Sequence, residues 1–207
     1  MPFNSSFKFA LTIVEQKTAD SDYCIYMKGA PEKIWSYCTS VIIKGDRKMK
    51  NKEWSDKFSK VNLHFGKQGE RVLGFASFHL PRSEFPLGFE FSTSNPEKFN
   101  FPIDNFSFIG LISLIDPPKD SVPYAVLECR SAGIKVVMVT GDQPTTAAAI
   151  AKQVNIIPKN IKTVEDLVDE GHSWEDAAEH TEAIIVHGDR ITEANRLDKE
   201  AAEEKIR

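Results

Sequence analysis

The chain has 207 residues, of which 41 % are apolar and 27 % charged, and its formal net charge is −4. These values exclude a disordered or collagen-like chain and allow one medium or two small globular domains. The charge is unevenly spread, with 15 Lys/Arg against 12 Asp/Glu in residues 1–115 and 11 against 18 in residues 116–207. A basic half suits an anionic ligand and an acidic half suits cations such as magnesium, although chance and an acidic tail explain the asymmetry equally well.

The cysteine count and the apolar runs exclude further classes. The chain has three widely spaced cysteines, Cys24, Cys38 and Cys129. An odd number at this spacing fits neither a disulfide framework nor a zinc site and predicts reduced thiols. No apolar run approaches the roughly 18 residues of a membrane-spanning helix. No signal peptide opens the chain. We expect the stretch itself to be soluble, although it could be a loop cut from a membrane protein.

The first 80 residues alternate short apolar runs with turn residues, a pattern that predicts antiparallel strands with a few helices. Pro31 begins a short helix that extends to about Cys38. Trp54, Phe58, Val61 and Phe65 follow the spacing of one helix face. The predicted strands are residues 7–15, 23–27, 41–43 and 71–80, with turns at 18–22 and 45–46.

The next segment, residues 81–105, is rich in Pro, Phe and Asn and predicts a loop that packs its aromatic rings on a neighbour. A strongly apolar strand follows at Phe106–Ile115. The pattern changes at the Pro117–Pro118 pair, which we interpret as a boundary between two halves.

Beyond that boundary the periodicity alternates between helix and buried strand. Helix faces are marked around 122–129 and 147–154, and apolar strands are predicted at Val136–Val139 and Ala183–Val186. Such alternation implies right-handed crossovers and a doubly wound parallel sheet.

The first candidate site is Val139–Asp142, at the end of a predicted strand and before a helix whose first turn contains Pro144. Ligands bind at such positions in open α/β sheets. Thr140 offers a hydroxyl, Gly141 allows close approach of the backbone to a phosphate, and the helix N-terminus favours anions. The equally weighted alternative is that Asp142 caps the helix and Gly141 makes a turn.

Three cations form the second group of candidates. Lys28 ends a strand, and Gly29 and a helix start follow it, so that the lysine can meet a nucleotide base or its phosphates. Arg71 begins a strand, and its guanidinium suits phosphate. Phe3 lies near Lys8 as a possible stacking ring beside a cation. The local alternatives are a solvated Lys28, an exposed ion pair of Arg71 with its neighbour, and a core Phe3.

Several familiar motifs do not occur, among them the Gly-x4-Gly-Lys-Ser/Thr phosphate loop, Gly-x-Gly-x-x-Gly and a nucleophile elbow. The five histidines lack metal-site spacing. A free-standing phosphatase of the haloacid-dehalogenase class would need an Asp-x-Asp nucleophile after an apolar strand, and no such triplet is found there.

Five strings occur in the order and spacing of the large cytoplasmic loop of P-type ATPases: PFNSSFKF, MKGAPEK, GERVLGF, NFSFIGLISLIDPPK and CRSAGIKVVMVTGDQPTTAAAIAK. The chain resembles this family from Pro2 to about Val168. It looks most like the α-subunits of the sodium/potassium and proton/potassium pumps, as a fragment of that loop.

The resemblance implies an α/β fold in two parts. Residues 1–115 would be the C-terminal part of an antiparallel-sheet nucleotide-binding (N) domain. Residues 116–207 would be part of a haloacid-dehalogenase-like, doubly wound phosphorylation (P) domain. The full pump would couple ATP hydrolysis, through an aspartyl-phosphate and magnesium, to sodium/potassium transport. The alternatives are a proton/potassium pump or a stand-alone, non-catalytic nucleotide-binding module.

The same resemblance assigns roles to matching residues. Phe3 would stack on adenine, Lys8, Lys28 and Gly29 would line its pocket, and Arg71 would reach the phosphates. Asp116 would lie at a hinge near the ribose. Thr140 and Gly141 would contact the γ-phosphate, and Asp142 would support that site.

Three departures from the family pattern limit these expectations. The Asp-Lys-Thr-Gly-Thr segment with the phosphorylated aspartate and the Gly-Asp-Gly-x-Asn-Asp magnesium segment do not occur. Position 10 is Ala where such pumps usually carry a pocket Gln, Gln143 replaces the usual His, and Thr146 stands where Ile-Thr-Ala normally occurs. We therefore predict no ATPase activity for these residues alone, no metal ligands among them, and ATP binding on the order of millimolar, about −4 kcal/mol.

The implied partners are ATP, the membrane helices and actuator domain of the pump and possibly a β-subunit, with no nucleic acid. The implied location is the cytoplasmic face of the plasma membrane, within an integral membrane protein.

Overall fold

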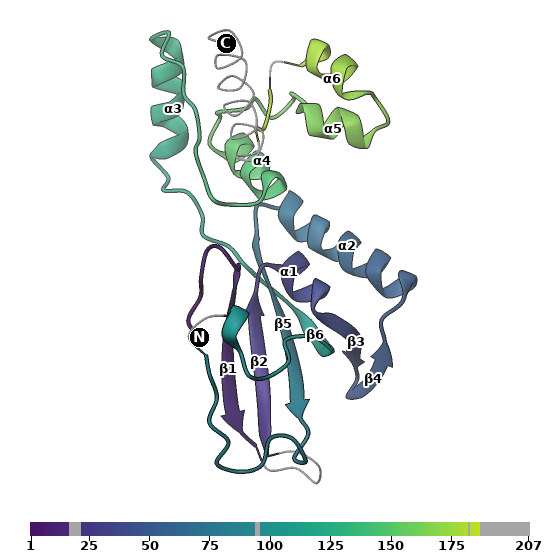
Figure 1. The fold of residues 1–207 in the computed structure, drawn as a ribbon. Helices are drawn as coiled ribbons and strands as arrows, with labels where there is room; N and C mark the ends of the chain where they lie inside the picture. The colour runs from purple at the N-terminus through teal and green to yellow at the C-terminus, as the bar shows by residue number, and fades with distance from the viewer. Residues whose placement is uncertain (17–21, 94–95, 182, 187–207) are drawn as a thin grey trace, which may run out of the picture. The chain divides into compact units, whose positions relative to one another are not determined.

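The computed structural model describes residues 1–16, 22–93, 96–181 and 183–186 (Figure 1). Most of the turn predicted at 18–22 lies outside this part. The chain separates into two compact units, one made of 1–66 and 70–115 and the other of 67–69 and 116–207.

Within the described residues, the first unit is built on one six-stranded sheet in the order β1-β2-β5-β6-β3-β4. The predicted strands are confirmed, with small shifts at their ends. The strands are β1 (Phe9–Glu15), β2 (Tyr23–Gly29), β3 (Cys38–Ile43), β4 (Asp46–Met49), β5 (Arg71–Leu80) and β6 (Phe106–Leu114).

The sheet is mixed, which corrects the expectation of an antiparallel one. The antiparallel pairs are β1 with β2, β2 with β5, β5 with β6, and β3 with β4. The remaining pair, β3 with β6, is parallel. Phe106 begins β6 by donating its N–H to the Tyr37 carbonyl, 3.1 Å away. The two strands therefore start at the same level and run in the same direction, a relation between distant segments that local patterns do not contain.

Helices cover one face of this sheet. Helix α1 (Pro31–Ser36) has Pro at its first position, as predicted, and its Ile34 is fully buried. Gly74 of β5 lets α1 approach, since a Cβ there would lie 3.2 Å from the Ile34 Cβ. Helix α2 (Lys52–Lys67) stacks Phe58 on Trp35 with ring centroids 4.5 Å apart. Val61, expected on the apolar face of α2, is instead exposed.

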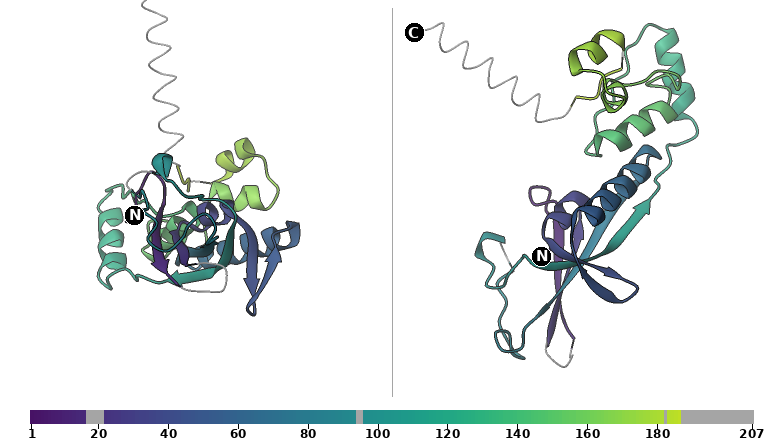
Figure 2. Two further views of the ribbon diagram at one scale, coloured as in Figure 1. Left: turned by 60° about the horizontal axis from the view of Figure 1, so that its bottom comes forward. Right: turned by 90° about the vertical axis from the view of Figure 1, so that its right-hand side faces the viewer.

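The segment 81–105 packs its aromatic rings as predicted, with a 3₁₀ turn η1 (Pro96–Lys98) as its regular part. Phe85 and Phe101 are buried in the core of the first unit. The segment is held at its start by a two-bond contact between the Arg82 guanidinium and the Asp22 carboxylate, at 3.0 and 2.9 Å. Figure 2 shows it running alongside the strands.

The second unit contains α3 (Val122–Ser131), α4 (Pro144–Gln153), α5 (Val164–Asp169) and α6 (Trp174–His180). The predicted helices around 122–129 and 147–154 are confirmed as α3 and α4. In the described ranges no helix has the length and apolarity to cross a bilayer.

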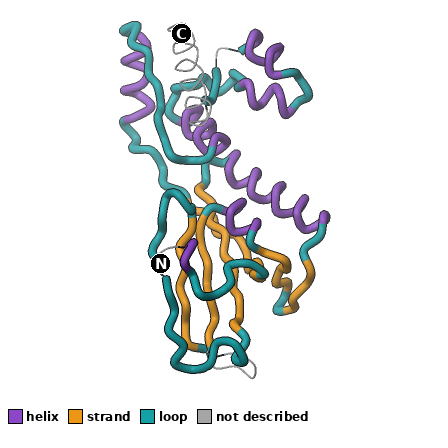
Figure 3. Tube along the Cα trace, in the orientation of Figure 1, coloured by secondary structure: helices purple, strands orange, loops and turns teal. Residues whose placement is uncertain are grey.

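The strands predicted at Val136–Val139 and Ala183–Val186 do not form. Among the described residues of this unit no strand is assigned there, and Figure 3 shows helix and loop only. Val139 is 94 % exposed and Val137 69 %. A strand exists through its hydrogen bonds to a neighbour, and no described segment of this unit lies beside these residues as a strand. A doubly wound sheet is therefore not seen here.

Candidate nucleotide-binding site

The strand register places Lys28 in a row with two other residues on the open face of the sheet. Ala10 of β1 pairs with Lys28 of β2, which pairs with Phe75 of β5. Directly paired residues point to the same face, and successive residues alternate. The next row, formed by Leu11, Met27 and Ala76, is almost fully buried. This row shares its face with Gly74, on which α1 packs, so the Lys28 row lies on the opposite face.

Arg71 lies on this same open face. It precedes Phe75 by four residues in β5, and an even spacing keeps the side chains on one side of a strand. At about 3.3 Å per residue, the two Cα atoms are about 13 Å apart along the strand. Arg71 and Lys28 are both exposed. One face therefore carries an aromatic ring and two separated cations.

Lys8 is held in an unusual backbone conformation immediately before β1. Its φ is 59°, in the left-handed region that costs a non-glycine residue roughly 1–2 kcal/mol. The Lys8 N–H donates to the Asn4 carbonyl at 2.7 Å, and the Lys8 carbonyl accepts from the Ala30 N–H at 3.0 Å. The Asn4 side chain accepts from the Ser6 N–H at 2.8 Å, which closes the turn. Lys8 is thereby fixed beside Ala30, which follows Lys28 by two residues in the chain, and such backbone strain is common at ligand sites.

Gly29 has a structural role within this turn. A Cβ at this position would lie well inside the van der Waals distance of the Lys8 carbonyl oxygen and 2.7 Å from the Phe9 Cα. The turn at Lys8 can therefore pack on β2 only if residue 29 is glycine. This requirement exists without any ligand, in addition to the close approach to a nucleotide that the resemblance implies.

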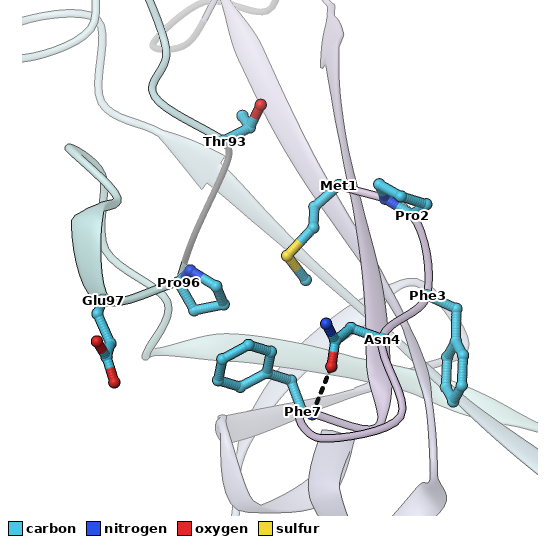
Figure 4. A pocket seen from close by; sticks show the side chains of 8 residues that line it. All are labelled: Met1, Pro2, Phe3, Asn4, Phe7, Thr93, Pro96 and Glu97. Carbon is cyan, nitrogen blue, oxygen red and sulfur yellow. Dashed lines mark hydrogen bonds between the residues drawn. The ribbon is translucent and has the colours of Figure 1, made fainter.

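Phe3 is 62 % exposed, so the alternative that it is a core side chain is wrong. It lines a cavity of about 460 Å³ together with Met1, Pro2, Asn4, Phe7, Thr93, Pro96 and Glu97. Figure 4 shows its ring directed away from Phe7 and Pro96. The lining contains an acid and no Lys or Arg, which disfavours a polyphosphate. We therefore place the candidate site on the open face rather than in this cavity.

In the second unit, Thr140 and Asp142 contact each other. The Thr140 hydroxyl donates to the Asp142 carboxylate at 3.0 Å and accepts from the Asp142 N–H at 3.1 Å. The N-cap of α4 is Gln143, which makes no side-chain capping bond. The N-cap position expected for Asp142 is therefore taken by Gln143. A Cβ on Gly141 would meet no atom within 4 Å, so packing does not require this glycine.

The remaining chemistry-bearing groups are poor candidates for catalysis. Asp116 lies exposed in the segment between β6 and α3. Burial raises the pKa of the Cys38 thiol to about 12, which leaves it protonated and unreactive at neutral pH. Across the part of the chain that the structure describes, no cluster of three or more His, Cys, Asp or Glu side chains could hold a metal ion.

Phe75 is the site residue that sequence reasoning missed. It belongs to the GERVLGF string, but its place beside Lys28 depends on the pairing of β2 with β5, which are 42 or more residues apart in sequence. The signal available was the alternation from Arg71 to Phe75, which predicts a shared face within one strand.

Comparison with known proteins identifies the family of the chain. A family model described as "P-type ATPase, cytoplasmic domain N" matches residues 1–121. The sodium/potassium-transporting ATPase subunit alpha of Drosophila melanogaster is 45 % identical over 204 residues, covering 96 % of this chain and 19 % of that protein. The corresponding subunit of Tetronarce californica is 50 % identical over 167 residues, covering 81 % of this chain and 16 % of that protein. The alpha-2 subunit of Bos taurus is 48 % identical over the same length, with the same coverage.

The chain thus spans less than a fifth of the length of the curated relatives that it matches. The family model covers more than half of it, including every strand of the sheet that bears Lys28 and Arg71. The chain therefore belongs to the P-type ATPase family.

Proposed function

We propose that this chain is the ATP-binding cytoplasmic segment of a pump that couples ATP hydrolysis, through an aspartyl-phosphate, to sodium/potassium transport. The observation that carries the proposal is the open sheet face with Lys28 and Phe75 in one row and Arg71 further along β5. An aromatic ring, a nearby ammonium and a more distant guanidinium match a purine base attached to a chain of phosphates.

In this proposal the first unit binds the base. Phe75 offers a ring face to adenine, and the family resemblance alone adds Phe3 as a second ring. Lys28 and Lys8 line the pocket beside Gly29, and Arg71 pairs with a phosphate. The Cβ of Ala10 leaves room beside Lys28 but offers no hydrogen bond to the base. Affinity then depends on stacking and charge, which supports weak binding, on the order of millimolar.

The second unit would contribute the phosphate end. We assign residues 1–115 to the nucleotide-binding domain and 116–207 to part of a haloacid-dehalogenase-like phosphorylation domain. Asp116 would lie near the ribose, and Thr140 and Gly141 would contact the γ-phosphate while Asp142 orients the Thr140 hydroxyl, to which it is hydrogen-bonded.

Phosphoryl transfer needs an aspartate nucleophile and magnesium. The sequence contains neither of the two family segments that supply them, and the described residues do not fit a metal site. We therefore assign binding and orientation to this chain and expect no turnover from it alone. Transport, a β-subunit and a location at the cytoplasmic face of the plasma membrane belong to the whole pump in this proposal.

A titration of ATP into the chain, followed by backbone amide chemical shifts, tests the binding site. We expect the shifts to concentrate around Lys8, Lys28 and Phe75 and to saturate at millimolar ATP. Lys28→Ala should weaken binding about tenfold, the effect of one lost charge-assisted bond. Lys98→Ala, a matched change at another exposed lysine of the first unit, should leave it unchanged. Equal affinity of the two variants would contradict the site.

A chimera tests the role in a pump. Residues 1–168 would replace the corresponding segment of the Drosophila alpha subunit, which aligns with 96 % of this chain. We expect phosphoenzyme formation from ATP to be retained and its ATP requirement to rise further with Lys28→Ala. A folded chimera that forms no phosphoenzyme would contradict the proposed function.

A further inference from the structure

The β3–β4 hairpin and the start of α2 carry a dense group of cations that nucleotide binding does not use. Residues 44–60 contain seven Lys or Arg and three Asp or Glu. Every residue of β4 is exposed, and the hairpin projects from the other strands (Figures 1 and 2). The basic edge, as we call it, consists of Lys44, Arg47, Lys48, Lys50, Lys52 and Lys60.

Two of these cations are held in place by the fold. The Lys50 ammonium donates to the Trp35 carbonyl at 2.9 Å and lies 5.0 Å from the centroid of the Trp35 ring. The Arg47 Nε donates to the hydroxyl of Ser40, which is fully buried, at 2.8 Å. That bond uses Nε, and the terminal nitrogens of a guanidinium can still fork onto a carboxylate. Cations that are already ordered lose less entropy when they bind an anion.

The backbone of β4 is oriented to pair with a further strand. β4 stands at one end of the sheet order, so no described strand lies beyond it. The Lys50 N–H donates to the Thr39 carbonyl at 2.8 Å, so the backbone groups of Lys50 face β3. In an antiparallel pair, every second residue directs its N–H and C=O groups to the neighbouring strand. The residues of the other parity, Arg47 and Met49, therefore direct these groups away from β3. An edge of this kind is a template for another chain.

The charge of the edge decides which chain fits. Lysine on an edge strand is a common device against pairing with other proteins, and one or two such residues suffice for it. Here the cations continue past the strand to Lys52 and Lys60 of α2, which such protection does not require. They repel a basic strand but complement an acidic one. Met49, 69 % exposed between them, adds apolar surface that an extended peptide would cover.

We propose that β4 binds an extended acidic peptide segment of a partner protein as an additional strand of the sheet. The backbone of the peptide pairs with Arg47 and Met49, and its carboxylates contact the basic edge. This mode of recognition takes affinity from main-chain bonds and specificity from side chains. It is independent of nucleotide binding, because it uses none of the residues on the Lys28 row.

The first experiment measures the charge requirement. The probe is a fluorescein-labelled 12-residue peptide of alternating Glu and Thr, titrated with the 207-residue chain in an anisotropy assay. We expect binding that weakens as salt rises. The double variant R47E/K48E should lower affinity about tenfold or more, since two attractions become repulsions. The matched double variant K98E/K159E, at exposed lysines that do not belong to the basic edge, should change it less than about twofold. Equal losses would show non-specific charge attraction and overturn the proposal.

The second experiment separates strand addition from simple ion pairing. Met49→Pro removes an N–H that points away from β3, so the β3–β4 ladder is retained. We expect it to weaken the peptide about fivefold, whereas Met49→Ala changes little. A peptide N-methylated at alternate residues makes the same test from the partner's side if the proline variant unfolds. Full binding of the N-methylated peptide would overturn the proposal. It would also be overturned if the chain bound anionic lipid vesicles and the acidic peptide did not displace them.

Discussion

The two units of this protein respond differently to the same kind of sequence signal. An apolar run at Phe106–Ile115 in the first unit forms β6, with ladder partners on both sides, β5 and β3. A similar run at Val136–Val139 in the second unit has no ladder partner among the described residues, and Val137 and Val139 stay exposed. An apolar run therefore indicates a tendency toward burial, and whether it becomes a strand depends on a neighbouring strand.

The largest expected effect tests this contrast directly. Phe106 is fully buried and Val139 is 94 % exposed. Phe106→Ala should lower the free energy of unfolding of the first unit by about 3–5 kcal/mol, because it leaves a cavity. Val139→Ala should change that of the second unit by less than about 0.5 kcal/mol.

Urea unfolding followed by tryptophan fluorescence separates the two units, because Trp35 and Trp54 lie in the first and Trp174 in the second. A cost above about 1 kcal/mol for Val139→Ala would mean that this valine is buried in solution and would end the contrast.

The next effect concerns glycines within the first unit. Gly29→Ala should cost about 3 kcal/mol, since the added methyl group meets the backbone of Lys8 and Phe9, which cannot move away as a side chain can. Gly110→Ala in β6 meets no atom within 4 Å and serves as the control, with a cost below about 1 kcal/mol. The denaturant midpoints of the two variants measure this difference in stability. Similar midpoints would show that the turn at Lys8 moves to accommodate the added methyl group.

Ion pairs provide a third comparison between the units. Arg82→Leu leaves the Asp22 carboxylate, which is 9 % exposed, without its two-bond partner, and should cost about 2 kcal/mol. Lys162→Leu breaks the Lys162–Glu170 pair of the second unit, in which both side chains are about half exposed, and should cost less than about 0.5 kcal/mol. If thermal unfolding shows equal losses, burial does not distinguish the two pairs.

Local signals predicted much of the first unit. The bounds predicted for β5, Arg71 and Leu80, match the structure, and Gly69 and Pro81 flank the strand. The turn predicted at 45–46 joins β3 to β4. The parallel pairing of Ser40 with Ser107 was not predictable, because it joins residues far apart along the chain. Pairing of this kind depends on the whole sheet, and local periodicity does not encode it.

The candidate site was also predictable only in part. The motifs identified Lys28 and Arg71 as candidate site residues. Their common face and the place of Phe75 between them follow from the register of β2 with β5. Gly29 was interpreted as a ligand-approach glycine, whereas its contact with Lys8 needs the fold of β1 onto β2. The ligand-binding roles stay predictions in both units, for Phe3, Lys8, Lys28, Gly29 and Arg71 as for Asp116, Thr140, Gly141 and Asp142.

The smallest expected effect is a pH dependence confined to the second unit. Partial burial acts to raise the pKa of Asp166, but hydrogen bonds from the Lys152 ammonium, at 2.8 Å, and from Thr163 outweigh it and hold that pKa below its ordinary value of 3.8. A carboxylate with a lowered pKa in the folded state stabilises the fold above its unfolded pKa, and this contribution is lost as pH falls through the folded pKa. Because the Lys152–Asp166 pair is about one-third exposed, we expect less than about 1 kcal/mol.

Asp166→Asn should lower the melting temperature of the second unit slightly near pH 7. The difference from the unchanged chain should vanish once pH has fallen below the folded-state pKa of Asp166, which is held below 3.8. The fluorescence of Trp174 reports the unfolding of this unit. The variant Glu179→Gln, at an exposed position on α6, controls for the loss of one negative charge. The two curves should converge as pH falls, because protonation removes in the unchanged chain the interaction that the substitution has already removed. A constant difference between them at all pH values would show that Asp166 acts through its neutral capping bond to Thr163 and not through its charge.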